Sequence, residues 1–265
     1  VMDSAPTQNV GDIAIDWKRG TIWVGTGEVN SSRSSYAGIG ILKSEDKGKT
    51  WQNMGLHDSH HISRILINPS NTDEVVVGVV GHLYSKNEER GIFKTTNGGK
   101  TWNKTLYIDD ETGIIDVAVS PKNFNVQYAA SWSKDRKAWD FIGSGATSGI
   151  YKSEDAGLTW KLFTTAESGF PVGEGVGRIG LAVYDDATVY AVLDNQFKRP
   201  LESKKSNSLP IAFSVPGDEF LKIPNKSLNS ILKNYGLTEK FRAENIKHWI
   251  QNGYLQPNEA AKVVL

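Results

Sequence analysis

The densest group of titratable side chains in the sequence is the segment HDSHH, which contains His57, Asp58, His60 and His61. A carboxylate among imidazoles suits general acid or base catalysis, because histidine changes its charge near neutral pH and an adjacent aspartate can orient the ring. In an extended chain His60 and His61 would point in opposite directions, so one of them is expected to lead into a strand. No third metal ligand follows at a convincing spacing, so we expect no metal site and no cofactor.

Three longer polar segments, 25–39, 81–90 and 131–148, also combine charged side chains with aromatic rings. Such a composition suits stacking on a sugar ring or holding a peptide. Structural alternatives stay open: a salt bridge in the first segment, an ion-pair brace in the second, and tryptophans packed on one another in the third. The candidate ligand-binding residues are Glu28, Arg33, Tyr36, His60, His61, His82, Trp132, Arg136 and Trp139.

Hydrolysis of a glycoside would need two carboxylates about 5 to 9.5 Å apart, one acting as the acid and the other as the base or nucleophile. Asp58 and Glu28 are the first candidates for catalytic residues. The wider set of carboxylates on the same segments is Glu28, Asp58, Asp109, Asp110, Asp140 and Glu174. The sequence selects no pair from this set, so catalysis stays an alternative to binding.

The elements that must position these segments come from a repeat. The stretches KSEDKGKTW, KTTNGGKTW and KSEDAGLTW begin at Lys43, Lys94 and Lys152, and each follows a glycine and an apolar pair. Two short runs rich in β-branched residues precede each stretch, and a fourth pair of runs follows the last one. Four antiparallel strands per unit, repeated at roughly 50 residues, predict the blades of a β-propeller.

Each repeated stretch contains the residues of a tight turn. Asp46 can accept backbone N–H groups of the turn, while Gly48 supplies the positive φ that a tight hairpin needs. Trp51 then opens the outermost strand and is expected to bury its ring against the blade, with a local partner for its indole N–H. A calcium loop is excluded, because the ligand spacing and the closing Glu of an EF-hand are missing. The residues with these structural roles are Asp46, Gly48, Trp51, Asn97, Gly99, Trp102, Asp155, Gly157 and Trp160.

Strand parity distributes the loops of such blades over two faces. The repeated turns and the shortest connections share one face, and the long segments go to the opposite face, where binding and catalysis concentrate. Asp12, Arg64 and Asp116 fall at equivalent positions of three successive inner strands. They predict an alternating belt of charge near the central channel or an ion-pair network between blades.

The pattern S/T-x-D/N-x-G-x-T-W resembles the Asp-box, or bacterial neuraminidase repeat, of sialidases, two-propeller xyloglucanases and the sortilin ectodomain. Longer stretches such as VGTGEVNSSRS, DSHHISRILINP and GHLYSKNEERGIFKTTNGGKTW are similar to bacterial sortilin-type propeller proteins, which are often labelled glycosyl hydrolase-like. The resemblance covers about residues 10–200 and implies an exported protein, periplasmic or extracellular, with a full propeller. The arginine cluster and Tyr–Glu pair of a sialidase are not found, and the catalytic carboxylates of the xyloglucanases map onto no residues of this chain.

The predicted fold class is all-β, a partial β-propeller of four-stranded Asp-box blades with a small C-terminal α-helical insertion. Residues 1–196 are assigned to the propeller, with blades at about 10–55, 61–106 and 113–163 and a half blade at 177–194. Propellers typically close with four to eight blades, so the remaining blades are expected from the parent chain or another chain.

Residues 197–265 are interpreted as a polar linker and a helical insertion that interrupts blade four of a longer protein. Apolar residues at helical spacing begin at Leu228, with Ser227 as the N-cap and Gly236 just past the end. A second stripe ends near Gly253, and a third helix starts at Pro257. A partner-docking module is the alternative role for this part.

Composition narrows the class of ligand. Thirty basic and thirty acidic residues leave no net charge to attract nucleic acid, and no apolar run approaches the roughly 20 residues of a membrane helix. The chain has no cysteine, which removes thiolate catalysis. Composition and loop length favour a propeller that binds a peptide, protein or glycan on its long-loop face, and the resemblance implies that it is exported. A glycoside hydrolase and a structural part of a larger secreted assembly are the alternatives.

Overall fold

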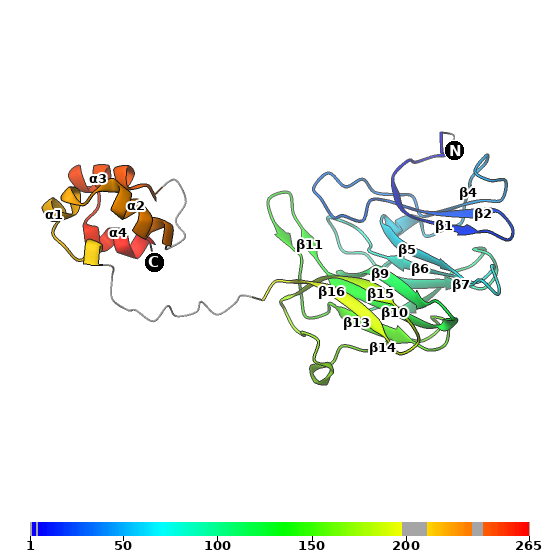
Figure 1. Ribbon diagram of the computed structural model, residues 1–265. Helices are drawn as coiled ribbons and strands as arrows, with labels where there is room; N and C mark the ends of the chain where they lie inside the picture. The colour runs from blue at the N-terminus through cyan, green and yellow to red at the C-terminus, as the bar shows by residue number, and fades with distance from the viewer. Residues whose placement is uncertain (1, 4, 198–210, 235–240, 265) are drawn as a thin grey trace. The chain divides into compact units, whose positions relative to one another are not determined.

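The computed structural model describes residues 2–3, 5–197, 211–234 and 241–264 (Figure 1). The chain divides into two compact units, residues 1–198 and 199–265. None of the described helices is long and apolar enough to cross a membrane.

The first unit is a partial β-propeller, as the repeat predicts. It contains three four-stranded antiparallel sheets, in each of which the strands pair in chain order, and two two-stranded sheets. The first two sheets consist of β1 (Val10–Asp16), β2 (Thr21–Thr26), β3 (Ile41–Ser44), β4 (Gln52–Asn53), β5 (Ile62–Ile67), β6 (Val75–Val79), β7 (Gly91–Thr95) and β8 (Asn103–Leu106). The third sheet and the half blade consist of β9 (Thr112–Ser120), β10 (Asn123–Ser133), β13 (Gly149–Ser153), β14 (Lys161–Leu162), β15 (Val176–Val183) and β16 (Val189–Asn195).

The apolar cores of this unit lie between successive blades. Trp23 and Ile41 of the first blade pack with Val77 and Phe93 of the second, and a separate cluster joins the second blade to the third. The middle strands therefore have both faces covered, which explains why β6 reads VVVGV rather than alternating apolar with polar residues.

The repeated turns fold as their residues predict. In the first turn the Oδ1 atom of Asp46 accepts the backbone N–H groups of Lys49 and Thr50, each at 2.9 Å, and Gly48 has a φ of 84°. Asp155 makes the same contacts in the third turn, with Thr159 N at 2.8 Å. The Oδ1 atom of Asn97 accepts the equivalent N–H in the second turn.

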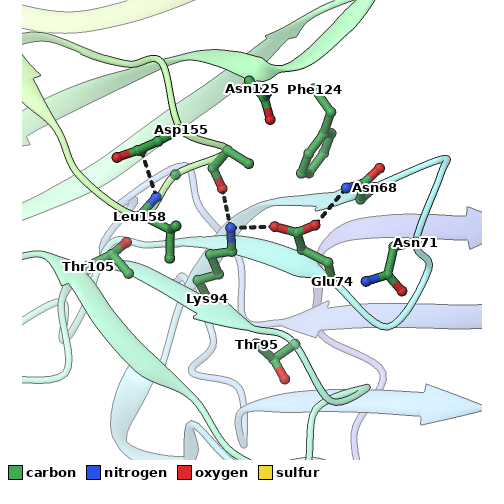
Figure 2. A network of polar contacts seen from close by, with 12 residues as sticks. Asn68, Asn71, Glu74, Lys94, Thr95, Thr105, Phe124, Asn125, Asp155 and Leu158 are labelled. Atoms are coloured by element: carbon green, nitrogen blue, oxygen red, sulfur yellow. Dashed lines mark hydrogen bonds and ion pairs between the residues drawn. The ribbon is translucent and has the colours of Figure 1, made fainter.

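These turns also join neighbouring blades, which the sequence did not predict. The Lys43 ammonium donates to the carbonyl of Gly98 (3.4 Å) in the next blade's turn, and Lys94 donates to the carbonyl of Ala156 (2.7 Å). Figure 2 shows Lys94 between this turn and the carboxylate of Glu74, which also accepts a hydrogen bond from Asn68 (2.6 Å).

The tryptophans of the turns reach back in the opposite direction. The indole N–H of Trp102 donates to the carbonyl of Met54 (2.7 Å) in the preceding blade. The indole N–H of Trp160 is shared between Thr105 Oγ1 of the preceding blade (3.3 Å) and the carbonyl of Gly157 in its own turn (3.2 Å). The expected local partner is therefore wrong for Trp102, because its ring lies between blades and packs edge-on against Trp23.

Ion pairs join the innermost strands of neighbouring blades. Arg64 Nε lies 2.7 Å from Asp116 Oδ1, and its guanidinium lies 3.7 Å from Asp12. The second oxygen of Asp12 accepts the Ile65 backbone N–H (2.7 Å), and that of Asp116 accepts the Leu181 N–H (2.8 Å). This confirms the prediction of an ion-pair network between blades.

Three local elements were not expected. The third long segment contains a small hairpin, β11 (Asp135–Arg136) and β12 (Phe141–Ile142), and short 3-10 turns form at η1 (His57–Ser59) and η2 (Ala166–Ser168). Two-residue strands and single turns carry no periodicity, so no pattern in the sequence could indicate them.

The second unit is helical. Its elements are η3 (Ile211–Phe213), α1 (Gly217–Lys222), α2 (Asn225–Asn234), α3 (Ala243–Gln251) and α4 (Pro257–Val264). Leu228, Ile246 and Ile250 are buried in its core with Phe220, which α1 contributes. The sequence missed α1, and α2 begins before the expected N-cap Ser227; the expected C-terminal Gly236 lies outside the described residues.

The first prediction concerns the buried lysine between blades. Lys94 is 3% exposed and Glu74 15%, so Lys94→Met leaves a largely buried carboxylate without its counter-charge. We expect the free energy of unfolding to fall by about 3 kcal/mol in chemical denaturation, with recovery when Glu74→Leu is added. Lys152→Met is the matched control, since the equivalent lysine is 25% exposed and pairs with an exposed carboxylate; its cost should stay below about 1 kcal/mol. Equal losses at the two lysines would contradict this account.

The second prediction concerns acid stability. Hydrogen bonds from the backbone and hydroxyl of Thr50 lower the pKa of Asp46 to about 2, and those of Thr159 lower the pKa of Asp155 to about 2 although partial burial opposes this. The pKa of each carboxylate is lower in the folded state than in the unfolded state. The two groups therefore stabilise the fold above about pH 4, and this contribution is lost as the pH falls toward 2.

Replacing both residues by asparagine should flatten the fall in unfolding free energy between pH 5 and 2, while the fold is kept. Asn97 supports this expectation, because its amide donates to Thr101 Oγ1 (2.8 Å) where Asp46 accepts from Thr50 Oγ1 (2.7 Å). Urea denaturation at stepped pH measures the slope, and an unchanged slope in the double variant would exclude these carboxylates as its source.

Candidate functional site

Three long loops, one from each complete blade, are joined to one another. The Tyr84 hydroxyl of the second loop donates to the carbonyl of Arg33 in the first (2.7 Å), and Arg136 of the third donates to the carbonyl of Ser31 (2.8 Å). Lys134 donates to the carbonyl of His82 (2.9 Å). The loops therefore form one continuous surface, which we call the long-loop surface: residues 27–40, 81–90 and 134–148.

A histidine and carboxylate cluster lies beside this surface. His82 Nε2 lies 2.9 Å from Asp58 Oδ1, and the rings of His60 and His82 stack with centroids 3.7 Å apart. Asp58 belongs to η1, whereas His82 lies 24 residues further along the chain. Sequence spacing alone could not pair them, because the contact exists only when the second blade folds against η1.

The backbone around this cluster is constrained. His60 has a φ of 53° and Leu56 a φ of 55°, values that favour glycine. The carbonyl of His60 accepts the Gly38 N–H (2.6 Å), and a side chain on Gly27 would collide with the same oxygen. The close approach of the first loop therefore fixes the position of His60.

Arg90 organises the second loop. Its side chain is almost completely buried and donates to the carbonyls of Val80, His82, Ser85 and Glu111. The alternative of an ion pair that holds this loop is wrong for Arg90, because its guanidinium binds carbonyl groups rather than a carboxylate. Burial lowers the pKa of Arg90.

Two further basic groups are buried beneath the cluster. Burial, with the charge of Arg90, lowers the pKa of Lys134 to about 7. Burial, with the charge of Lys134, lowers the pKa of His61 to about 4. His61 is 2% exposed and directly precedes β5, so it leads into the strand as one of the two histidines was expected to do. A buried ring is not available to a ligand, and the ligand-binding assignment of His61 is corrected.

Two neighbouring carboxylates differ in their protonation behaviour. Burial and the negative charge of Asp58 raise the pKa of Glu89, whose carboxylate accepts the Asp58 N–H (2.6 Å). At Asp58 slight burial opposes ionisation, but the hydrogen bond and charge of His82 lower its pKa. Carboxylates with pKa values moved apart are the arrangement of an acid and a base. Glu89 was not among the predicted catalytic residues.

The aromatic rings of the surface divide into exposed and buried groups. Tyr36 is 64%, Tyr84 49% and Trp139 86% exposed, so these rings are available to a ligand. Trp132 is 4% exposed and donates its indole N–H to the carbonyl of Gly143 (2.8 Å). Its assignment as a ligand-binding residue is corrected, because the ring belongs to the core between the third and fourth blades.

The remaining candidates are placed as follows. Glu28 accepts the backbone N–H of Tyr36 (3.3 Å), and Arg33 has an exposed side chain. Arg136 stacks over the Phe141 ring at 3.9 Å. Asp109 and Asp140 accept neighbouring backbone N–H groups in turns, which gives both a local structural role.

The cluster can support two kinds of chemistry. His82 is held between Asp58 on Nε2 and the Ser85 hydroxyl on Nδ1 (2.7 Å), an arrangement that allows proton transfer. Asp58, His60 and His82 also bring three potential metal-ligand atoms within 4.8 Å of one another, so the fold supplies a third potential ligand, His82, that the spacing in the sequence did not indicate.

Comparison with known proteins gives limited information. No protein-family model and no curated protein matches the chain. Among solved structures, an ancestral GH74 enzyme is similar over 69% of this chain and 21% of its own, with 18% identity and a TM-score of 0.46. The GH74 xyloglucanase from Xanthomonas campestris is similar over 64% of this chain and 24% of its own, with 14% identity and a TM-score of 0.43.

A structure described as YCF48 bound to D1 peptide is similar over 71% of this chain and 48% of its own, with 14% identity and a TM-score of 0.39. The chain thus spans about a fifth to a half of the length of these three proteins.

Proposed function

We propose that this chain is part of an exported Asp-box propeller of sortilin type, which acts in the periplasm or outside the cell. In this proposal the long-loop surface binds a peptide, a protein or a glycan. The observation that carries the proposal is the hydrogen-bonded union of three loops, one from each complete blade, around exposed aromatic rings. A surface fixed before binding loses little conformational entropy when a ligand arrives.

The chemistry of the surface favours an uncharged or weakly charged ligand with flat apolar faces. Trp139 and Tyr36 offer exposed rings for stacking, and Arg33 offers a charged donor at the rim. Sugar rings and peptide side chains both present such faces. The chain's zero formal net charge gives no long-range attraction for a polyanion.

A glycoside hydrolase is the second candidate, and one observation favours it. Asp58 and Glu89 are adjacent carboxylates whose pKa values are shifted in opposite directions. In this alternative Glu89 is the acid and Asp58 the base or nucleophile. Release of reducing ends from soluble polysaccharides, lost in both Asp58→Asn and Glu89→Gln, would select this alternative over binding alone.

We also propose that residues 197–265 interrupt blade four and that the remaining strands of that blade come from the parent chain or another chain. Lys43 binds the turn of the following blade although it also pairs with Glu45 of its own turn (2.8 Å). Lys152 makes the equivalent pair with Glu154 (2.8 Å), but no complete blade follows it among the described residues. Beside β16 lies an open pocket of about 600 Å³ whose lining includes the apolar residues Phe163 and Val189 together with polar groups such as Glu167.

Hydrogen exchange tests this arrangement in the protein purified from its natural cells. Tyr190 and Val192 of β16 are 65% and 77% exposed in the present unit. The amides of β16 that do not pair with β15 should be protected in the natural protein as strongly as those of β10. Rapid exchange along β16 in that material would argue against further strands at this edge.

The binding proposal predicts that the two faces of the propeller respond differently to loss of an aromatic ring. A panel of soluble polysaccharides, sialosides and immobilised peptides is first screened for the ligand that binds most tightly. Trp139→Ala should lower the affinity for that ligand by about tenfold to thirtyfold, because stacking on an exposed ring is lost. Trp17→Ala is the matched control: Trp17 is 85% exposed in the β1–β2 turn, on the opposite face. Biolayer interferometry gives the affinities.

Equal affinities for Trp139→Ala and the unchanged protein would remove the long-loop surface as the binding site. Equal losses for Trp139→Ala and Trp17→Ala would indicate nonspecific adhesion. If no member of the panel binds and no reducing ends are released, a structural role in a larger assembly becomes the remaining explanation.

A further inference from the structure

We propose that Asp58, His60 and His82 form a binding site for a divalent metal ion, with zinc as the best-suited ion. One carboxylate oxygen and two imidazole nitrogens lie within 4.8 Å of one another. Zinc accepts this set of ligands, and three protein ligands leave a fourth position open for water or a ligand atom. The proposal stands on these residues alone and does not depend on the proposed binding function.

The distances are close to those that coordination requires. Zinc bonds to nitrogen and oxygen of about 2.0 to 2.2 Å place adjacent ligand atoms of a tetrahedron about 3.3 Å apart. Asp58 Oδ1 and His82 Nε2 are already 2.9 Å apart. The rings of His60 and His82 are stacked at an interplanar angle of 17°, and each nitrogen lone pair lies in the plane of its ring. Coordination therefore requires the His60 ring to turn out of the stack, while His82 keeps its direction toward Asp58.

The neighbouring groups hold the ligands in the required orientation. Ser85 Oγ binds His82 Nδ1 (2.7 Å), which leaves Nε2 as the nitrogen directed toward Asp58. The side-chain amide of Asn87 donates to the carbonyl of Asp58 (2.9 Å) and restrains η1. Hydrogen bonds of this kind to metal-ligating histidines and carboxylates fix the tautomer and the direction of the ligand atom.

The local charges act on a cation in both directions. Glu89 lies against Asp58 through the Asp58 N–H, so two carboxylates share one small region and attract a cation. The basic groups Arg90 and Lys134 donate to the carbonyl of His82, and their positive charge opposes this attraction. Asp58 has a side chain that is 61% exposed, so the open coordination position faces solvent beside the long-loop surface.

Titration of the chelator-treated chain with Zn²⁺ alone tests the proposal, with isothermal titration calorimetry as the measurement. We expect one equivalent to bind at pH 7.5. His82→Ala, His60→Ala and Asp58→Asn should each weaken binding by at least tenfold, and Ser85→Ala by a smaller factor, up to about tenfold. His57→Ala is the matched control, because His57 belongs to the same η1 turn but not to the cluster; its affinity should be unchanged.

A second measurement needs no substitution and therefore leaves the fold unchanged. In the unchanged chain, NMR signals of the imidazole rings report which of the five histidines respond to Zn²⁺. The proposal requires shifts at His60 and His82, with His248 of the helical unit unaffected. Absence of zinc binding at millimolar concentration, binding that survives His82→Ala, or shifts at other histidines alone would each overturn it.

Discussion

The hydrogen bond from a blade's buried lysine to the next blade's repeated turn determines how the rest of the propeller is arranged. Lys94 can be buried only because Ala156 O and the Glu74 carboxylate replace its lost water. The turn can offer that carbonyl only because two consecutive residues, Ala156 and Gly157, take positive φ values of 59° and 81°. Local turn chemistry thus sets the contact between blades.

This arrangement leaves the opposite face free to vary. Because the turns, the inner-strand ion pairs and the apolar clusters hold successive blades together, the loops on the other face are not needed for that purpose. They can be long, polar and strained, as His60 shows with its φ of 53°. They still require internal support, and Arg90 provides it by binding four carbonyl groups from within the second loop and its surroundings. A buried guanidinium used in this way fixes a loop without any contact to a ligand.

The features that the sequence predicted correctly are those that depend on residues close together in the chain. The strands, the turns around Asp46 and the half blade follow from β-branched runs and from the demand of tight turns for glycine and aspartate. The ion pair of Arg64 followed from counting equivalent positions. The burial of Trp132 and His61 could not be predicted, because exposure depends on which blade packs against each ring. The pairing of Asp58 with His82 was missed for the same reason, since it depends on how η1 meets the second loop.

The two hydrogen bonds of His82 carry different amounts of information about function. Its contact with Ser85 joins residues three apart in one turn, and such a contact arises readily from local turn geometry. Its contact with Asp58 joins residues 24 apart and is maintained by Asn87, Arg90 and Lys134, none of which is needed to connect the strands. A long-range contact supported by several independent hydrogen bonds is costly for a loop to form by chance, because each donor must give up water and side-chain freedom. The Asp58–His82 pair is therefore the more informative half of this arrangement, and both the acid–base and the metal-binding interpretations depend on it.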